Sequence, residues 1–223
     1  MLLAEDLLLL LTDDDTGRLV VPGQEVDIAL GGAQLLALSL QQRVDVDARK
    51  RLVVLDPSPC GDALLDEALQ EVARRAGRKP SDVVARLGKR LRGTLYERLA
   101  AAGILRAEQG RVLGLFPTHT WPTSSADHEA EVRRALTAVL VQGATPEPHD
   151  AALVALLHAL RATHKVVVPA EHGLRRRDLD RRAKEIAEGS WASDAVRRAV
   201  DAVTAATVAA ITAVTAGAAG AGS

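Results

Sequence analysis

Apolar residues recur at helical spacing along most of the chain, and short apolar runs between turn residues separate these stretches. The spacing predicts helices over residues 2–11, 25–42, 62–76, 81–102, 127–142, 151–163 and 175–188, and a last helix from Ser190 or Ser193 onwards. Turn-bounded apolar runs predict a short strand over 18–21 and hairpins over 44–55 and 104–116. We therefore predict a mainly α protein: a single helical domain over residues 1–216, with a core helix bundle, surrounding amphipathic helices and one or two small β-hairpins, and a flexible tail over 217–223.

The helix predicted over residues 81–102 has two chemically distinct faces. Its apolar stripe consists of Leu87, Leu91, Leu95 and Leu99. The opposite face carries Arg86, Lys89 and Arg90 around Gly93, with Arg92 at its edge. A glycine among cations leaves room for an anionic ligand to approach the backbone. Two interpretations remain open: a surface helix with solvated arginines, or an anion site.

The hairpin predicted after this helix pairs Ile104-Leu105 with Val112–Phe116 through a turn at Gln109-Gly110, and a polar loop is expected over 117–125. Its apolar side chains belong to Val112, Leu113, Leu115 and Phe116. They could pack onto the core, insert into a membrane or form an oligomer interface. A helix followed by a hairpin also fits a winged-helix nucleic-acid reader, with residues 81–102 as recognition helix and 104–116 as wing.

Gly31 and Gly32 interrupt the apolar pattern of the helix predicted over 25–42. Each glycine costs about 1 kcal/mol relative to alanine inside a helix. We therefore expect the pair to serve close packing, a helix break or access for a ligand.

Composition narrows the class of protein. The 223 residues are 48% hydrophobic and 26% charged, as in a folded soluble chain. The formal net charge of −1 argues against a domain that binds nucleic acid over its whole surface, so an anionic partner must meet a local patch. The single Cys60 excludes an intrachain disulfide and fits a reducing compartment. No secretory signal is expected, and residues 202–217, about 16 in length, fall short of the roughly 20 that a spanning helix needs.

No familiar catalytic motif occurs in the chain. G-x-S-x-G, Walker A, H-E-x-x-H and C-x-x-C patterns are all absent. His158 and His164 are six residues apart, which is poor spacing for one metal ion. We therefore expect no enzyme activity, no cofactor and no metal site.

Several blocks of the sequence resemble the Golgi phosphoprotein 3 family, in order and over nearly the whole chain. The most specific is CGDALLDEAL at 60–69, which is similar to the family's GD-x-LLDEAL segment. Residues 2–11, 29–44, 91–105 and 149–162 are similar to its leucine-rich first helix, its LRG block, the run before its hairpin and its P-H-x-x-x-x-x-L-A-L helix. The preference for arginine over lysine further indicates a bacterial member.

The resemblance implies a peripheral membrane protein that binds anionic phospholipid headgroups, phosphatidylinositol 4-phosphate or a similar phosphoinositide. The family's two basic pocket residues on the helix before the hairpin fall on Lys89 and Arg92, with Arg90 as a neighbour. The pocket tryptophan and the arginine of LRG fall on Pro22 and Gly31, which depart from the pattern. The resemblance further implies a cytoplasmic, membrane-associated protein (at the Golgi in a eukaryote), no nucleic-acid partner and a hairpin that assists insertion or self-association.

Overall fold

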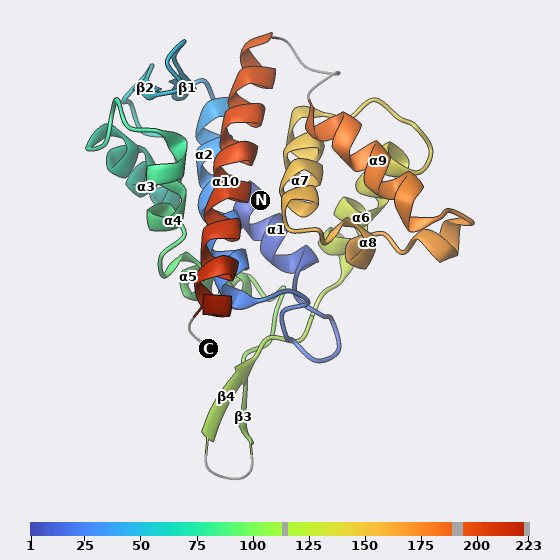
Figure 1. Ribbon diagram of the computed structural model, residues 1–223. Coiled ribbons are helices and arrows are strands. Elements are labelled where there is room, and N and C mark those ends of the chain that lie inside the picture. The colour runs from blue at the N-terminus through green and yellow to red at the C-terminus, as the bar shows by residue number, and fades with distance from the viewer. Residues whose placement is uncertain (113–115, 189–193, 221–223) are drawn as a thin grey trace.

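The computed structural model describes residues 1–112, 116–188 and 194–220, and it confirms a mainly α fold (Figure 1). The first half of the chain contains α1 (Leu3–Leu10), α2 (Gly23–Leu40), β1 (Val44–Val46), β2 (Leu52–Val54), α3 (Ala63–Ala73), the 3₁₀ turn η1 (Pro80–Asp82), α4 (Val84–Leu87) and α5 (Leu91–Ala101). The second half contains β3 (Glu108–Val112), β4 (Phe116–Thr120), α6 (Asp127–Leu140), α7 (Pro148–Ala159), α8 (Thr163–Val166), the 3₁₀ turn η2 (Pro169–His172), α9 (Arg176–Ala187) and α10 (Asp194–Gly220).

The core forms where α2, α7 and α10 lie side by side, with α1 packed among α2, α5, α6 and α7 (Figure 1). All eight residues of α1 are buried, and α7 is buried from Ala151 to Leu157. Leucine, valine and alanine fill the core, because the chain contains few aromatic residues. The remaining helices cover the bundle with one apolar face each, as their amphipathic patterns predict.

Gly31 and Gly32 provide close packing, one of the three roles expected for them. A Cβ on Gly31 would lie 1.9 Å from the Val84 carbonyl oxygen of α4, and one on Gly32 would lie 2.6 Å from Oγ1 of Thr207 in α10. The helix α2 is not broken there. The two glycines therefore allow α4 and α10 to approach the backbone of α2.

The segment predicted as one helix over 81–102 is divided. The 3₁₀ turn η1 and α4 are followed by a break at residues 88–90, and α5 begins at Leu91. Gly88 packs against the backbone of α2, since a Cβ there would lie 1.7 Å from the Asp27 carbonyl oxygen. Arg90 adopts a left-handed conformation, φ +67°, and is the N-cap of α5. Tertiary packing overrides the continuous leucine stripe here.

The second hairpin is displaced along the sequence from its predicted position. Residues 104 and 105 lie outside the strands, and the predicted turn residues Gln109 and Gly110 lie within β3. β4 occupies much of the segment expected to be a polar loop. The strands pair from Glu108↔Thr120 to Val112↔Phe116, and the hairpin projects from the helical body (Figure 1). Residues 18–21 likewise form no strand; Leu19 makes an isolated bridge to Thr12.

The last helix is longer than predicted. α10 extends to Gly220, past residue 217 where we placed the start of the tail, and the division into domain and tail stays a prediction. Its residues Val200–Gly217 are long and apolar enough, by length and composition alone, to cross a membrane, and 28% of this window is buried within the fold. Val203 and Thr207 pack into the core, so part of α10 is buried. The apolar segment is 18 residues long, longer than the 16 taken from the sequence.

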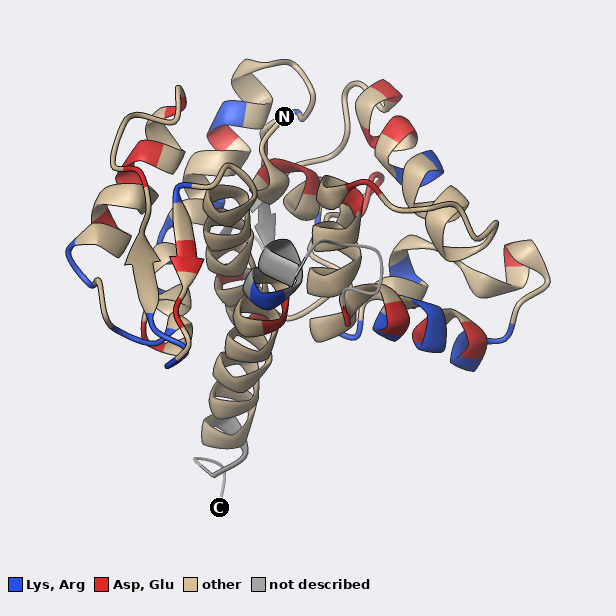
Figure 2. Ribbon diagram, turned by 90° about the horizontal axis from the view of Figure 1, so that it is seen from above, with Lys and Arg blue, Asp and Glu red and all other residues tan. Residues whose placement is uncertain are grey.

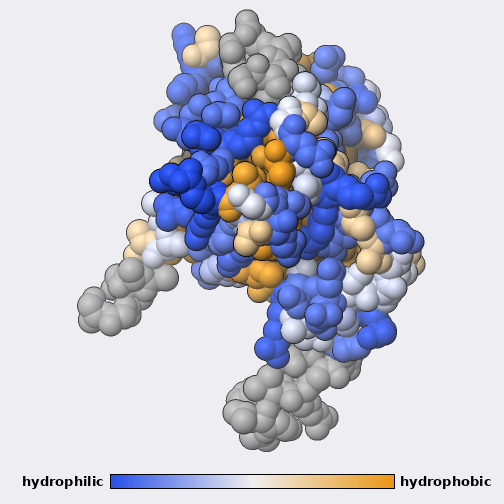
Figure 3. Space-filling view, turned by 90° about the vertical axis from the view of Figure 1, so that its right-hand side faces the viewer, coloured by the Kyte–Doolittle hydropathy of each residue, from blue (hydrophilic) through white to orange (hydrophobic). Residues whose placement is uncertain are grey.

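The surface charge is mixed in sign. Cations and carboxylates alternate along α9, where they form ion pairs three or four residues apart (Figure 2). On the face seen in Figure 3, a small apolar area is enclosed by hydrophilic residues. Groups of neighbouring cations or of neighbouring carboxylates on the described surface are therefore small.

Candidate functional site: a cationic cleft between α3, α4 and α5

A surface cleft of about 590 Å³ lies where α3 faces α4 and the start of α5. Its cations are Arg74, Arg86, Lys89 and Arg90. Glu67 and Glu71 contribute carboxylates, and Gln34 reaches the cleft from α2. The cleft thus brings Lys89 and Arg90, two of the predicted site residues, into one depression.

The four cations differ in how far their charge is already balanced. Glu71 lies 2.8 Å from Arg74 and 3.6 Å from Arg86, and a third arginine, Arg75, lies 2.7 Å from it. Hydrogen bonds from Arg74 and Arg75 hold the pKa of Glu71 below its ordinary value. Lys89 and Arg90 are exposed and make no ion pair within the described part of the chain.

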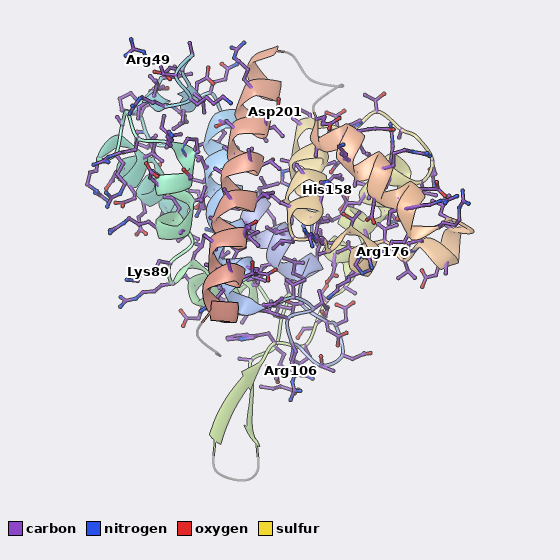
Figure 4. All side chains as sticks on the ribbon, in the orientation of Figure 1. Arg49, Lys89, Arg106, His158, Arg176 and Asp201 are labelled. Carbon is purple, nitrogen blue, oxygen red and sulfur yellow. The ribbon has the colours of Figure 1, made fainter. Side chains whose placement is uncertain are left out.

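The side chain of Lys89 projects away from the helical body (Figure 4). Arg90 follows it in the left-handed conformation and is the N-cap of α5. The break between α4 and α5, which the sequence pattern did not predict, thus carries both free cations.

The GD-x-LLDEAL block positions the other wall of the cleft. Gly61 has φ +82°, which suits glycine, and Asp62 is the N-cap of α3, accepting a hydrogen bond from the Leu64 N–H at 3.0 Å. The Asp66 carboxylate accepts a hydrogen bond from the Cys60 N–H at 2.5 Å. Arg98 of α5 lies 2.7 Å from Asp62 and so connects the start of α3 to the helix that follows the cationic break.

Arg92, the second residue of the predicted basic pair, lies outside this cleft. Its guanidinium is 3.1 Å from the Asp27 carboxylate, and it packs against Gly23 at the start of α2. Burial raises the pKa of Asp27, and the charge of Arg92 partly opposes this increase. The structure therefore brings Lys89 together with Arg90 and places Arg92 against another carboxylate.

Arg92 contributes to a second, shallower depression of about 440 Å³. Trp121 and Tyr96 line it, with ring centroids 5.0 Å apart and nearly parallel planes. Arg18 and Gly93 complete its surface, and a Cβ on Gly93 would meet no atom within 4 Å. The sequence placed Trp121 in a polar loop without a role, because only the tertiary structure brings it to α5.

The structure explains one of the two departures from the family pattern. Pro22 is the N-cap of α2, with φ −56°. Gly31 faces the backbone of α4 too closely for any side chain. An aromatic residue thus comes to Arg92 from Trp121 rather than from position 22, and no side chain can reach a ligand from position 31.

The predicted hairpin residues lie only partly within the described structure. Val112 ends β3 and pairs with Phe116 at the start of β4. Leu113 and Leu115 lie outside the described residues. Membrane insertion and self-association through the hairpin stay predictions.

Two buried carboxylates form clusters that the sequence analysis missed. Asp6 is bracketed by His128 and His149, whose Nε2 atoms lie 2.7 and 2.8 Å from its two oxygens. Burial raises the pKa of Asp6, but the hydrogen bonds from both histidines outweigh it and hold the pKa below its ordinary value. Helix periodicity could not reveal this cluster, since its members come from three separate helices.

The second cluster contains Glu129, which is 3% exposed and pairs with Arg133 at 2.6 Å. Burial raises the pKa of Glu129 to about 7; Arg133 lowers it, and the nearby Asp14 carboxylate raises it. Among the described residues, no group of three or more His, Cys, Asp or Glu side chains is arranged to hold a metal ion.

Fold and site together define a mainly α protein with a cationic cleft open to solvent. Comparison with known proteins identifies its family: the profile of Golgi phosphoprotein 3 matches residues 3–203. The chain therefore belongs to the Golgi phosphoprotein 3 family. It is also 28% identical over 165 residues to vacuolar protein sorting-associated protein 74 of Eremothecium gossypii, an alignment that covers 62% of this chain and 49% of the relative. The chain thus aligns with about half the length of this relative.

Proposed function

We propose that the protein binds anionic phospholipid headgroups, phosphatidylinositol 4-phosphate or a similar phosphoinositide, and docks peripherally on the cytoplasmic face of a membrane. The observation that carries the proposal is the pair of exposed cations, Lys89 and Arg90, at the mouth of a cleft of about 590 Å³. Cations without a carboxylate partner can donate charge-assisted hydrogen bonds to a phosphate. Membership in the Golgi phosphoprotein 3 family agrees with a membrane role. A bacterial source stays a prediction.

The electrostatics favour weak, reversible docking. Each basic residue near an anionic leaflet contributes about 1 kcal/mol, and the effect declines within a Debye length. Lys89 and Arg90 together thus provide about 2 kcal/mol, and Arg74 and Arg86 less, because Glu71 partly balances them. We expect the protein to act by binding rather than by catalysis.

Vesicle co-sedimentation tests the proposal. The wild type should bind phosphatidylcholine vesicles containing phosphatidylinositol 4-phosphate and release them as salt is raised, since the attraction is screened. Lys89→Ala/Arg90→Ala should weaken binding about tenfold or more. Arg49→Ala/Lys50→Ala is the matched control, because it removes two exposed adjacent cations from the β1–β2 turn. Equal binding to neutral and anionic vesicles, or equal loss in both variants, would contradict the proposal.

Arg92→Gln tests whether the headgroup binds in the cleft or at Arg92, the position that the family pattern implies. Because Arg92 is engaged with Asp27, its replacement should reduce binding less than the double variant does. A larger loss of binding would indicate that the headgroup binds in the depression beside Trp121.

The winged-helix alternative, with residues 81–102 as recognition helix, stays a prediction. The break between α4 and α5 divides that segment, so α5 alone is the helix that precedes the hairpin. That the protein has no nucleic-acid partner remains a prediction. Self-association through the hairpin also remains a prediction.

A further inference from the structure

Gln34 lines the cationic cleft and carries a buried, unpartnered hydrogen-bond acceptor. The residue is 3% exposed, lies on α2 beneath α3 and the α4–α5 break, and lines the cleft. Its Oε1 atom is buried and accepts no hydrogen bond from the described residues. Buried amide oxygens normally accept a hydrogen bond, because an unpaired one loses its hydration and gains no hydrogen bond in exchange. A ligand group that donates a hydrogen bond would remove this penalty.

The cleft therefore combines cations at its mouth with a buried hydrogen-bond acceptor. Lys89 and Arg90 are exposed at the mouth and attract anionic oxygens. Gln34 is buried, and its amide oxygen, when it faces a ligand, repels anionic oxygens, because an ionised phosphate has only acceptors to offer it. The group that reaches Gln34 must instead donate, as a hydroxyl does.

The lining of the cleft fits a ligand with both kinds of group. Glu67 adds a second acceptor that has an exposed side chain, and Thr94 adds a hydroxyl. The volume of about 590 Å³ falls in the range of pockets that enclose whole small molecules rather than single ions. A bare phosphomonoester would use the mouth of the cleft and leave its floor unpaired.

We propose that Gln34 is a specificity-determining residue: its side-chain oxygen accepts a hydrogen bond from a hydroxyl of a phosphorylated polyol whose phosphate lies against Lys89 and Arg90. This inference rests on the proposed function, because it assumes that the cleft binds the headgroup. It adds that the cleft distinguishes a polyol phosphate from a phosphate without hydroxyls. The same chemistry could come from a lipid headgroup or from a free polyol phosphate.

The test compares two lipids with the wild type and one variant. Vesicles contain phosphatidylinositol 4-phosphate or phosphatidic acid at matched surface charge; both carry a phosphomonoester, and only the first carries ring hydroxyls. Gln34→Met preserves the length of the side chain and removes the acceptor. We expect Gln34→Met to weaken binding to phosphatidylinositol 4-phosphate about three- to tenfold and to leave binding to phosphatidic acid unchanged.

Two controls make the result specific. Lys89→Ala/Arg90→Ala should weaken binding to both lipids, since both phosphates use the mouth of the cleft. The melting temperature of Gln34→Met should equal or exceed that of the wild type, because the variant removes a buried unpaired oxygen. Calorimetry with soluble inositol 1,4-bisphosphate identifies the source: saturable binding that Gln34→Met weakens indicates a free polyol phosphate, and vesicle-only binding indicates the lipid.

The outcomes separate the inference from the proposed function. If the folded variant retains the wild-type preference between the two lipids, the role of Gln34 is overturned while headgroup binding stands. If the wild type binds neither lipid better than neutral vesicles, the proposed function fails and the inference fails with it.

Discussion

Replacing Gly31 by alanine tests whether α2 and α4 are in backbone contact. A Cβ at this position would lie 1.9 Å from the Val84 carbonyl oxygen and 2.7 Å from the Gly88 amide nitrogen. Both atoms belong to the backbone, so no side-chain rotation can relieve the overlap. The whole of α4 must shift instead.

The cost of that shift follows from what α4 buries. Val83 and Val84 are fully buried, and overpacking at such sites typically costs 1–3 kcal/mol. We take the upper end, about 3 kcal/mol, because the clash is with backbone on two sides. Alanine favours the helix by about 1 kcal/mol relative to glycine, so the free energy of unfolding should decrease by about 2 kcal/mol. For a chain of this size the melting temperature should fall by about 4–8 °C.

Gly93→Ala is the matched control. This glycine also lies inside a helix, but a Cβ there would meet no atom within 4 Å. The substitution should therefore stabilise the protein by about 1 kcal/mol and raise the melting temperature by about 2–4 °C.

Thermal unfolding followed by circular dichroism measures both variants under the same conditions. Opposite shifts of the melting temperature support the close approach of α2 and α4. If Gly31→Ala melts at or above the wild type, the backbones are not in contact and the explanation for the missing family arginine is wrong. Because the displaced segment leads to Lys89, Gly31→Ala should also weaken vesicle binding, whereas Gly93→Ala should not.

Three further predictions concern buried polar groups. Glu129 retains its proton to about pH 7 in the folded protein but only to its ordinary pKa near 4.5 in the unfolded chain. The free energy of unfolding should therefore decrease as pH rises across this window. Glu129→Gln should remove up to about 3 kcal/mol of that decrease in a pH series of urea titrations. Arg98→Met removes the pair with the buried Glu5 at 2.8 Å and the pair with Asp62 at 2.7 Å, and should cost about 2 kcal/mol in the same assay; an unchanged midpoint would contradict a role for these two pairs. Tyr96→Phe removes the 2.9 Å hydrogen bond with Thr12 and should cost about 1 kcal/mol; a variant as stable as the wild type would contradict a role for this hydrogen bond.

Local patterns in the sequence predicted most helices and the first hairpin. Helices predicted over 127–142 and 175–188 occur at Asp127–Leu140 and Arg176–Ala187, because amphipathic spacing requires one face of each to be buried. The β1–β2 pairing occurs where turn residues separate two apolar runs. These features depend on neighbours in the chain, so the sequence alone was sufficient.

The second hairpin and the helix before it depended on distant residues. Gly88, the C-cap of α4, packs against Asp27, 61 residues earlier in the chain, and no local pattern records that contact. The strand register was displaced because the apolar run and the Gln109-Gly110 pair fitted a tight turn that the fold does not use. Short strands whose register local pattern fixes only weakly are ambiguous in a single sequence.

The helical class, the family resemblance and the basic character of residues 86–92 can be read from the chain alone. Which of those cations remain available depends on how the helices pack. This packing engages Arg92 with Asp27, balances Arg74 and Arg86 with Glu71, and leaves Lys89 and Arg90 exposed above Gln34. The physical reason is that periodicity assigns a side chain to a face of its own helix, whereas charge balance and burial depend on the neighbours that other helices bring to that face.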